Sequence, residues 1–253
     1  MRNCSGARCL GWASVLALAA LAGRAQASGP LRTAVLATAD VRVEVSAGQS
    51  APKLAGLSRP SGAAWRNTQE ETLPASVEVH GAAVPVTWRL KRELGSADAH
   101  HVVFVYECAQ PHLRLKWQWE ARAGFGPVEH RITIENLSGE EIWLPMVDSL
   151  RLDWRAPADE ALRNFYVEKG ADTPSAQGTH LEAVGEGYRW TGKSSTYAHP
   201  VPGEAREIIP VEFVYAAAHP EDGWFAGIEF SGRTRIALER TGDSLKTVLG
   251  LNP

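Results

Sequence analysis

The residues from Gly187 to Ser194 read GYRWTGKS and match the spelling of a phosphate-binding loop, G-x-x-x-x-G-K-[ST]. In such a loop, small residues let backbone N–H groups wrap a phosphate, and a helix begins directly after the lysine. Here the loop interior holds bulky side chains, and Pro200 and Pro202 follow before a helix can grow. We therefore interpret the match as a coincidence and expect no nucleotide binding.

Carboxylates are the next candidates, because glycoside hydrolysis needs two of them facing one bond. Acidic residues are plentiful, yet no motif marks any two as a pair: Asp148, Asp153, Glu168, Asp222, Glu229 and Asp243. Asp222 precedes Gly223 and is expected to occupy a turn. The sequence predicts no catalytic residue.

Metal and acyl-transfer chemistry are not indicated either. The histidines show no H-x-x-x-H spacing and the cysteines no C-x-x-C spacing. Ser231, in FSGRT, lacks the flanking glycines of a nucleophile elbow, which also requires a strand-to-helix turn. We expect no metal site and no cofactor.

Tryptophans offer another chemistry, because an aromatic face can stack on a sugar ring. Trp65 and Trp190 lie in the turn-rich segments GAAWRN and GYRWTG, where they either stack on a sugar or pack against a second domain. With their polar neighbours they form the candidate carbohydrate-binding set: Trp65, Arg66, Trp190, Lys193, Ser194 and Ser195.

The elements that must position these residues are strands. Segment 113–120 alternates polar with apolar residues, the apolar ones being Leu113, Leu115, Trp117 and Trp119. This period of two is typical of a half-buried strand, so both tryptophans are expected in the core. The same period recurs in three further segments: 41–46, 128–136 and 211–215.

In segment 211–215, Val211, Phe213 and Tyr215 form the apolar side, which we expect to be buried. Segment 101–109 is apolar on successive residues, as in a central strand covered on both faces. Turn residues separate these segments at short intervals, and no long amphipathic helix interrupts them. The pattern predicts an all-β fold, a large antiparallel β-sandwich.

The first 27 residues are typical of a secretory signal peptide. Arg2 and Arg8 precede an apolar stretch, Cys9 to Ala22, that is too short to span a membrane. An A-x-A cleavage site ends at Ala27. We expect export to the periplasm or outside the cell and a mature chain of residues 28–253, long enough for one large β domain.

Cleavage after Ala27 also changes the cysteine and charge balance. It removes Cys4 and Cys9, so Cys108 remains alone and no internal disulfide can form. It removes three arginines from the 26 basic residues, which leaves 23 against 29 acidic ones and a formal net charge of −6. This balance argues against nucleic acid as a partner.

Three segments carry a family resemblance: GPVEHRITIEN (126–136), GKSSTYAHP (192–200) and GWFAGIEFSG (223–232). They resemble the N-terminal β-sandwich of α-galactosidase-like enzymes of glycoside hydrolase family 36, in which a Gly-x-Ser-Ser loop precedes a glycine-centred aromatic strand ending in Ser-Gly. Thr196 stands where the family commonly has His, and His199-Pro200 stands where it has Asn-Pro. The matching residues are Gly192, Ser194, Ser195, Gly227, Ser231 and Gly232.

The resemblance implies a β-supersandwich of the galactose-mutarotase-like type. In the family this domain packs on a catalytic barrel, takes part in oligomers and lends loops to the active-site mouth, while the barrel supplies the catalytic aspartates. Our first hypothesis is a non-catalytic N-terminal domain, truncated before its barrel, with a galactoside-type carbohydrate and the barrel or a second copy as partners. The alternative is a stand-alone exported carbohydrate-binding or interaction module.

Overall fold

The computed structural model describes residues 33–156, 160–169, 178–194, 206–230 and 232–252, and the structural statements below concern these residues. The expected signal peptide and its cleavage site lie outside them. Within these ranges, no helix has the length and apolarity that a membrane crossing needs. The regular structure consists of strands and one short 3-10 helix, which confirms the predicted all-β fold.

The strands of the first half are β1 Thr33–Ala37, β2 Arg42–Ala47, β3 Pro52–Ser58, β4 Trp65–Asn67, β5 Ser76–Val79, β6 Ala82–Pro85, β7 Arg89–Leu90, β8 Ser96–Ala97, β9 His101–Cys108, β10 Leu113–Ala121 and β11 Val128–Asn136, with the 3-10 helix η1 at Arg92–Leu94. Those of the second half are β12 Ile142–Trp143, β13 Asp148–Arg155, β14 Leu162–Glu168, β15 Thr179–Val184, β16 Arg189–Ser194, β17 Arg206–Ala216, β18 His219–Gly227, β19 Thr234–Thr241 and β20 Ser244–Leu251.

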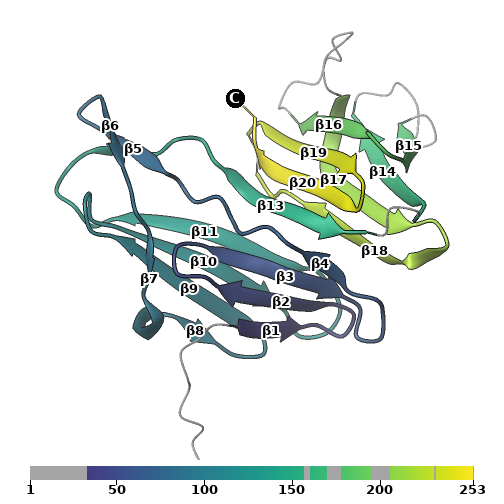
Figure 1. Cartoon of the computed structure of the whole chain (residues 1–253), viewed down its shortest axis with the longest axis horizontal. Coiled ribbons are helices and arrows are strands. Elements are labelled where there is room, and N and C mark those ends of the chain that lie inside the picture. The colour runs from purple at the N-terminus through teal and green to yellow at the C-terminus, as the bar shows by residue number, and fades with distance from the viewer. Residues whose placement is uncertain (1–32, 157–159, 170–177, 195–205, 231, 253) are drawn as a thin grey trace, which may run out of the picture.

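The N-terminal half is a sandwich in which β1, β2 and β3 lie over the sheet of β9, β10 and β11 (Figure 1). As the alternation predicts, β10 buries Trp117 and Trp119 between the two sheets. The apolar strand β9 is buried along nearly all of its length, and its last residue, Cys108, is buried as well. The core of this half therefore follows directly from the period of the sequence.

One long sheet joins this half to the next. Its order is β1-β2-β3-β4-β13-β20-β19-β16-β17-β14-β15, with β18 added on β17. The three-residue strand β4 is the junction, because it pairs with β3 on one side and with β13 on the other. Buried Asn67 strengthens this junction: its amide nitrogen donates to the carbonyl of Leu54 at 2.6 Å, and its amide oxygen accepts from the backbone of Asp153 at 2.8 Å.

In β17 the predicted orientation is wrong. Glu212 and Val214 face the interior, whereas Phe213 lies on the outer face, 38% exposed. Phe213 sits in register between Phe165 of β14 and Phe225 of β18, with ring centroids 5.6 Å apart in both pairs. Such cross-strand aromatic pairs stabilise a sheet face without full burial, so β17 carries apolar residues on both of its faces.

Candidate functional site

An open pocket of about 710 Å³ lies where β13, β16 and β19 meet the segments 72–76 and 145–147. One wall is apolar and contains Leu73, Pro74, Pro145, Met146 and Val147. The polar and charged lining residues include Asp148, Arg151, Thr191, Lys193 and Arg235. A concave site with an apolar wall and a few polar groups is the usual form of a small-molecule site.

Strand register explains why these polar residues meet, although they are far apart in the sequence. Lys193 of β16 lies opposite Arg235 of β19, and Arg235 lies opposite Gly250 of β20. Gly250 in turn lies opposite Asp148 of β13. The four residues therefore form one row across four neighbouring strands, which we call the charge row. Beyond Lys193 the register continues to Glu207 of β17.

Gly250 is required for this row because Asp148 reaches across it. A Cβ atom at Gly250 would lie 2.3 Å from Asp148 Oδ1 and 2.8 Å from Asp148 Cα. Both distances are shorter than non-bonded atoms tolerate. The missing side chain at Gly250 lets the Asp148 carboxylate pass over β20 and contact Arg235.

The Asp148 carboxylate is held between two guanidinium groups. Its Oδ2 accepts from Arg151 Nε at 2.8 Å, and its Oδ1 accepts from Arg235 Nη2 at 2.8 Å. The Asp148 side chain is only 6% exposed, whereas those of Arg151 and Arg235 are 40% and 34% exposed. Asp148 thus holds both guanidinium groups in place, while part of each arginine side chain stays exposed to solvent.

The pocket has an excess of positive charge. Lys193 lies on the same side of β16 as Thr191, and both residues line the pocket. Behind the row, Glu71 accepts a 3.3 Å hydrogen bond from the backbone N–H of Arg151, and burial raises the pKa of Glu71 to about 8. Glu71 is then mostly protonated at neutral pH. Among the lining residues, Asp148 is the carboxylate and Arg151, Lys193 and Arg235 are the cations, with Glu207 of β17 in register beside Lys193.

The two candidate tryptophans are not on loops, and that expectation is corrected. Trp65 lies in β4, 9% exposed; its Nε1 donates to the carbonyl of Asp222 at 2.6 Å, and its ring meets Trp154 edge-on at 6.1 Å. Trp190 lies in β16, 7% exposed, against Tyr166 at 4.9 Å. Both rings pack in the core, so neither face is open to a sugar in this conformation.

The other candidate residues are scattered. Arg66 is exposed on β4 and pairs with Glu44. Ser194 is buried and accepts a hydrogen bond from Lys169 Nζ at 2.7 Å. Ser195 lies outside the described residues. Of the predicted set, Lys193 is the residue that lines the described pocket.

The phosphate-loop match is part of a strand and a turn. Residues from Arg189 to Ser194 form β16, paired with β19 on one side. A Cβ at Gly192 would lie 2.5 Å from Ile208 Cδ1 and 2.6 Å from the Trp190 ring, so this glycine serves packing. Its backbone groups belong to the sheet rather than to an anion-binding loop.

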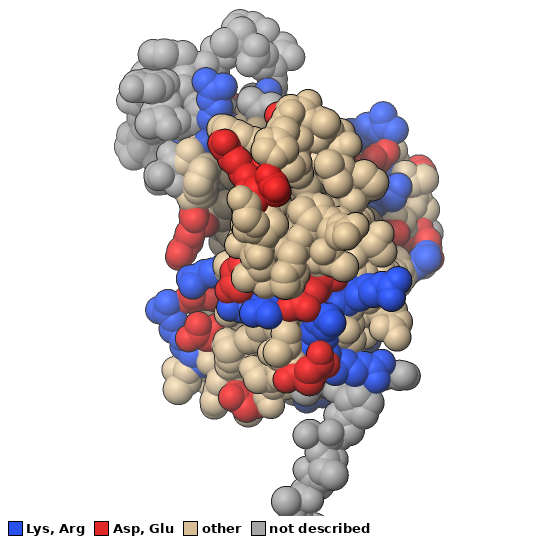
Figure 2. Space-filling model, turned by 90° about the vertical axis from the view of Figure 1, so that its left-hand side faces the viewer, with Lys and Arg blue, Asp and Glu red and all other residues tan. Residues whose placement is uncertain are grey.

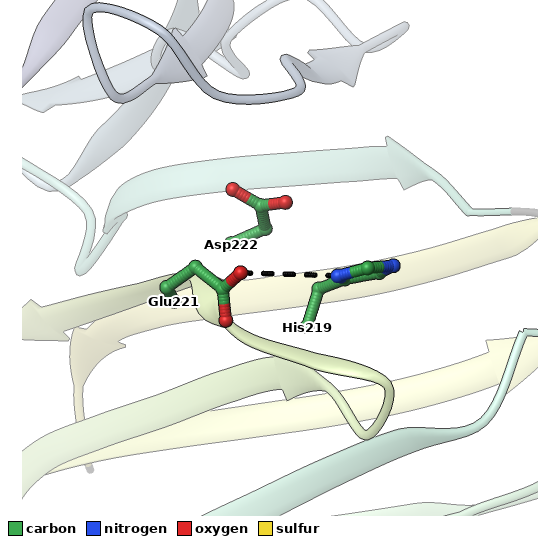
Figure 3. Close-up of side chains that lie close together, drawn as sticks. All are labelled: His219, Glu221 and Asp222. Atoms are coloured by element: carbon green, nitrogen blue, oxygen red, sulfur yellow. Dashed lines mark ion pairs between the residues drawn. The ribbon is translucent and has the colours of Figure 1, made fainter.

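Asp222 belongs to a second polar group, His219, Glu221 and Asp222 (Figure 3), whose oxygen and nitrogen atoms lie within 4.8 Å of one another. Asp222 is inside β18 rather than in the predicted turn, and it accepts from Arg59 Nη2 at 2.9 Å. His219 and Glu221 are 66% and 53% exposed. Since Asp222 is already paired and its neighbours are solvated, we assign no ligand here.

A third polar group is enclosed in the second half of the protein. Tyr188 and Tyr166 each donate to Glu182, at 2.7 Å. Asn164 donates to the Tyr188 hydroxyl at 3.1 Å. Glu212 lies beside Asn164 with no exposed surface, and burial raises its pKa to about 9. Glu182 and Tyr188 are half-buried, and no residue of this group is among the described lining residues of the pocket.

A second open pocket, of about 730 Å³, is lined by Arg89, Lys91, Glu107 and His112 among others. Glu107 binds Arg114 at 2.7 Å and lies 3.5 Å from Lys91, so its charge is used within the sheet. The hydrogen bond from Arg114 is the main cause of the lowered pKa of Glu107. No candidate residue from the sequence lines this pocket.

The fold is similar to that of solved α-galactosidases. The GH36 α-galactosidase AgaA from Geobacillus stearothermophilus superposes with a TM-score of 0.63 over 88% of this chain, at 12% identity. An AgaA variant in complex with raffinose gives 0.60 at 14% identity, and AgaB from the same organism gives 0.59 at 14%. No protein-family model and no curated protein matches the sequence.

The similarity covers only part of those enzymes. The chain spans 37% of AgaA and 36% of AgaB. At this level of identity the comparison establishes a shared fold. The resemblance seen in three short motifs is therefore matched by the three-dimensional structure: the chain has the fold of a portion of GH36 α-galactosidases.

Proposed function

We propose that this chain is a non-catalytic β-sandwich domain of an exported α-galactosidase-like glycoside hydrolase. It supports a catalytic domain and lends a pocket to carbohydrate recognition beside it. The observation that carries the proposal is the structural match over 88% of this chain, which accounts for 37% of AgaA. A match of that extent is what one domain of a larger hydrolase gives.

The chemistry of the pocket supports a binding role rather than a hydrolytic one. Retaining hydrolysis needs a nucleophile and an acid/base about 5 Å apart on one substrate. In the described lining of the pocket, Asp148 is the one carboxylate, and two arginines hold both of its oxygens. A carboxylate fixed in this way is neither a free nucleophile nor a proton donor.

The surface next to the pocket supports a docking partner. Trp143, Leu144 and Met146 are 64%, 47% and 57% exposed, and Met146 belongs to the apolar wall of the pocket. Figure 2, which faces the side of the molecule that carries β5 and β6, shows a broad area without charged side chains above a band of mixed charge. Exposed apolar patches of this kind mark sites of protein contact.

Activity and association test the proposal together. Purified residues 28–253 should release no p-nitrophenol from p-nitrophenyl α-galactoside above a blank. They should also self-associate in analytical ultracentrifugation, and Trp143→Gln should shift them towards monomer. Phe125→Ser is the matched control, because Phe125 is 81% exposed but lies between β10 and β11 rather than in the exposed segment 143–146. Turnover abolished by Asp148→Asn would disprove the non-catalytic role.

The pocket equally suits the second candidate, a stand-alone exported carbohydrate-binding module. This alternative predicts a monomer that is unaffected by Trp143→Gln and that binds sugar without a partner. The sedimentation experiment therefore separates the two functions.

A further inference from the structure

A line of apolar side chains crosses the outer face of the strands β15, β14, β17 and β18. Phe213 of β17 lies opposite Phe165 of β14 and Phe225 of β18, with ring centroids 5.6 Å apart in both pairs. Phe165 lies opposite Leu181 of β15. Because residues directly opposite each other share one face of a sheet, these four side chains form one continuous line, which we call the aromatic row.

Much of the aromatic row is exposed to solvent. Leu181, Phe213 and Phe225 are 56%, 38% and 48% exposed. Ile209, which alternation places on the same face of β17 as Phe213, is 45% exposed. At about 200 Å² for a fully exposed side chain of this size, these four residues leave roughly 350 Å² of apolar surface in water.

The surroundings of the aromatic row contain little charge. The residues two positions before and after its members, on the same face, are Arg163, Val167, Thr179, Ala183, Val211, Tyr215, Gly223 and Gly227. Arg163 is the one charged residue among them. Homodimer interfaces are more apolar than other interfaces, and charged residues are depleted from interface cores. The composition of this face therefore fits a second copy of the chain better than a charged partner.

The exposed area also fits a dimer. A standard interface buries about 800 Å² per partner, and about 65% of a homodimer interface is apolar, or roughly 500 Å². The exposed side chains supply most of this apolar area, and the half-buried Phe165, Val211 and Tyr215 add to it. Two sheets can pack face to face about 10 Å apart with interdigitated side chains, so two copies of the aromatic row cover each other.

A sugar fits this face less well. Stacking of a sugar chain needs aromatic faces that lie in a common plane. The ring of Phe213 is inclined by 80° to that of Phe165 and by 32° to that of Phe225, so the three rings form no such plane.

We propose that the outer face of β15, β14, β17 and β18 is a self-association surface on which a second copy of the chain packs, row against row. This surface shares no residue with the lining of the pocket or with the exposed residues Trp143, Leu144 and Met146. The inference therefore goes beyond the proposed function and concerns a different surface.

Sedimentation equilibrium of residues 28–253 carrying Trp143→Gln tests the inference, because this change weakens the other association surface. We expect a monomer–dimer equilibrium that 500 mM salt does not weaken, since salt screens charges and not apolar contacts. Phe225→Ser and Leu181→Ser, at the two ends of the row, should each raise the dimer Kd at least tenfold, because each dimer loses two contacts. Leu94→Ser is the matched control: Leu94 is 45% exposed but lies in η1 of the N-terminal half, and its Kd should not change.

The outcomes separate this inference from the proposed function. A monomer at every concentration in the Trp143→Gln chain overturns the second copy as the occupant, while association that depends on Trp143 still supports the proposed docking surface. A dimer that survives both Phe225→Ser and Leu181→Ser, or that Leu94→Ser weakens equally, also overturns the aromatic row. If Phe225→Ser lowers Tm by more than a few degrees, Leu181→Ser decides, because Leu181 is the most exposed member of the row.

Discussion

Gly250→Ala is the substitution that most directly tests the charge row. The new Cβ would meet Asp148 Oδ1 at 2.3 Å and Asp148 Cα at 2.8 Å. The carboxylate can rotate away, but only by leaving Arg235. No side-chain rotation relieves the clash with the backbone of Asp148, so β13 and β20 must move apart.

The magnitude follows from these two effects. Inserting one methyl group into a packed site costs about 1–3 kcal/mol. Loosening the ion pair between Asp148 and Arg235 adds up to about 1 kcal/mol, because Arg235 is 34% exposed and solvent screens the pair. The sum is roughly 1–4 kcal/mol. For a domain of this size, that corresponds to a fall in Tm of about 2–16 °C.

Differential scanning calorimetry at pH 7 measures the change. The matched control is Gly139→Ala, because a Cβ at Gly139 meets nothing within 4 Å and its φ is not in the left-handed region; its Tm should stay within about 1 °C of the parent. If the Tm of Gly250→Ala equals that of the parent protein, the contact between Asp148 and β20 does not require a glycine at position 250.

Three further predictions concern the interior and export. Burial raises the pKa of Glu212 from 4.5 to about 9, so the folded state keeps a proton that the unfolded chain releases, and the free energy of unfolding must fall as the pH rises from 4.5 to 9. In urea denaturation, Glu212→Gln should leave the free energy of unfolding unchanged near pH 4 and increase it at pH 8. If both proteins show the same pH profile, Glu212 is not a buried neutral acid. Trp65→Ala should cost about 3–5 kcal/mol as a core truncation without altering sugar binding below its melting range, whereas a normal Tm with lost binding would return Trp65 to the carbohydrate site. Mass spectrometry of exported protein should find Ser28 as the first residue, and intact Met1 would contradict the signal peptide.

The sequence predicts well the strands whose two faces differ clearly in polarity. In β10 the apolar positions are the buried ones, so alternation alone identifies the core. The same reasoning gives the wrong face for β17, because Glu212 is buried and Phe213 is on the surface. A hydropathy pattern does not show that the carboxyl group of Glu212 can be buried in its protonated form. Nor does it show that two neighbouring strands place aromatic rings beside the exposed Phe213.

The site is harder to predict than the fold. Turn residues around Trp65 and Trp190 predict loops, but both tryptophans lie in short strands, β4 and β16, that pair with neighbouring strands of the long sheet. Lys193 stands out only for its position in a motif that the protein does not use. Its partners Arg235 and Asp148 carry no local signal at all, because only the register of four strands brings them together.

The buried thiol of Cys108 can report local opening of the N-terminal sandwich. Its thiol is 2% exposed and donates a weak hydrogen bond to the carbonyl of Gln110 at 3.4 Å. It is the one cysteine of residues 28–253, the mature chain that the sequence predicts. Reaction with a soluble disulfide reagent then needs exposure of the end of β9 and follows the population of open molecules rather than a surface side reaction. The rate of that labelling therefore measures how often the N-terminal sandwich opens at the end of β9.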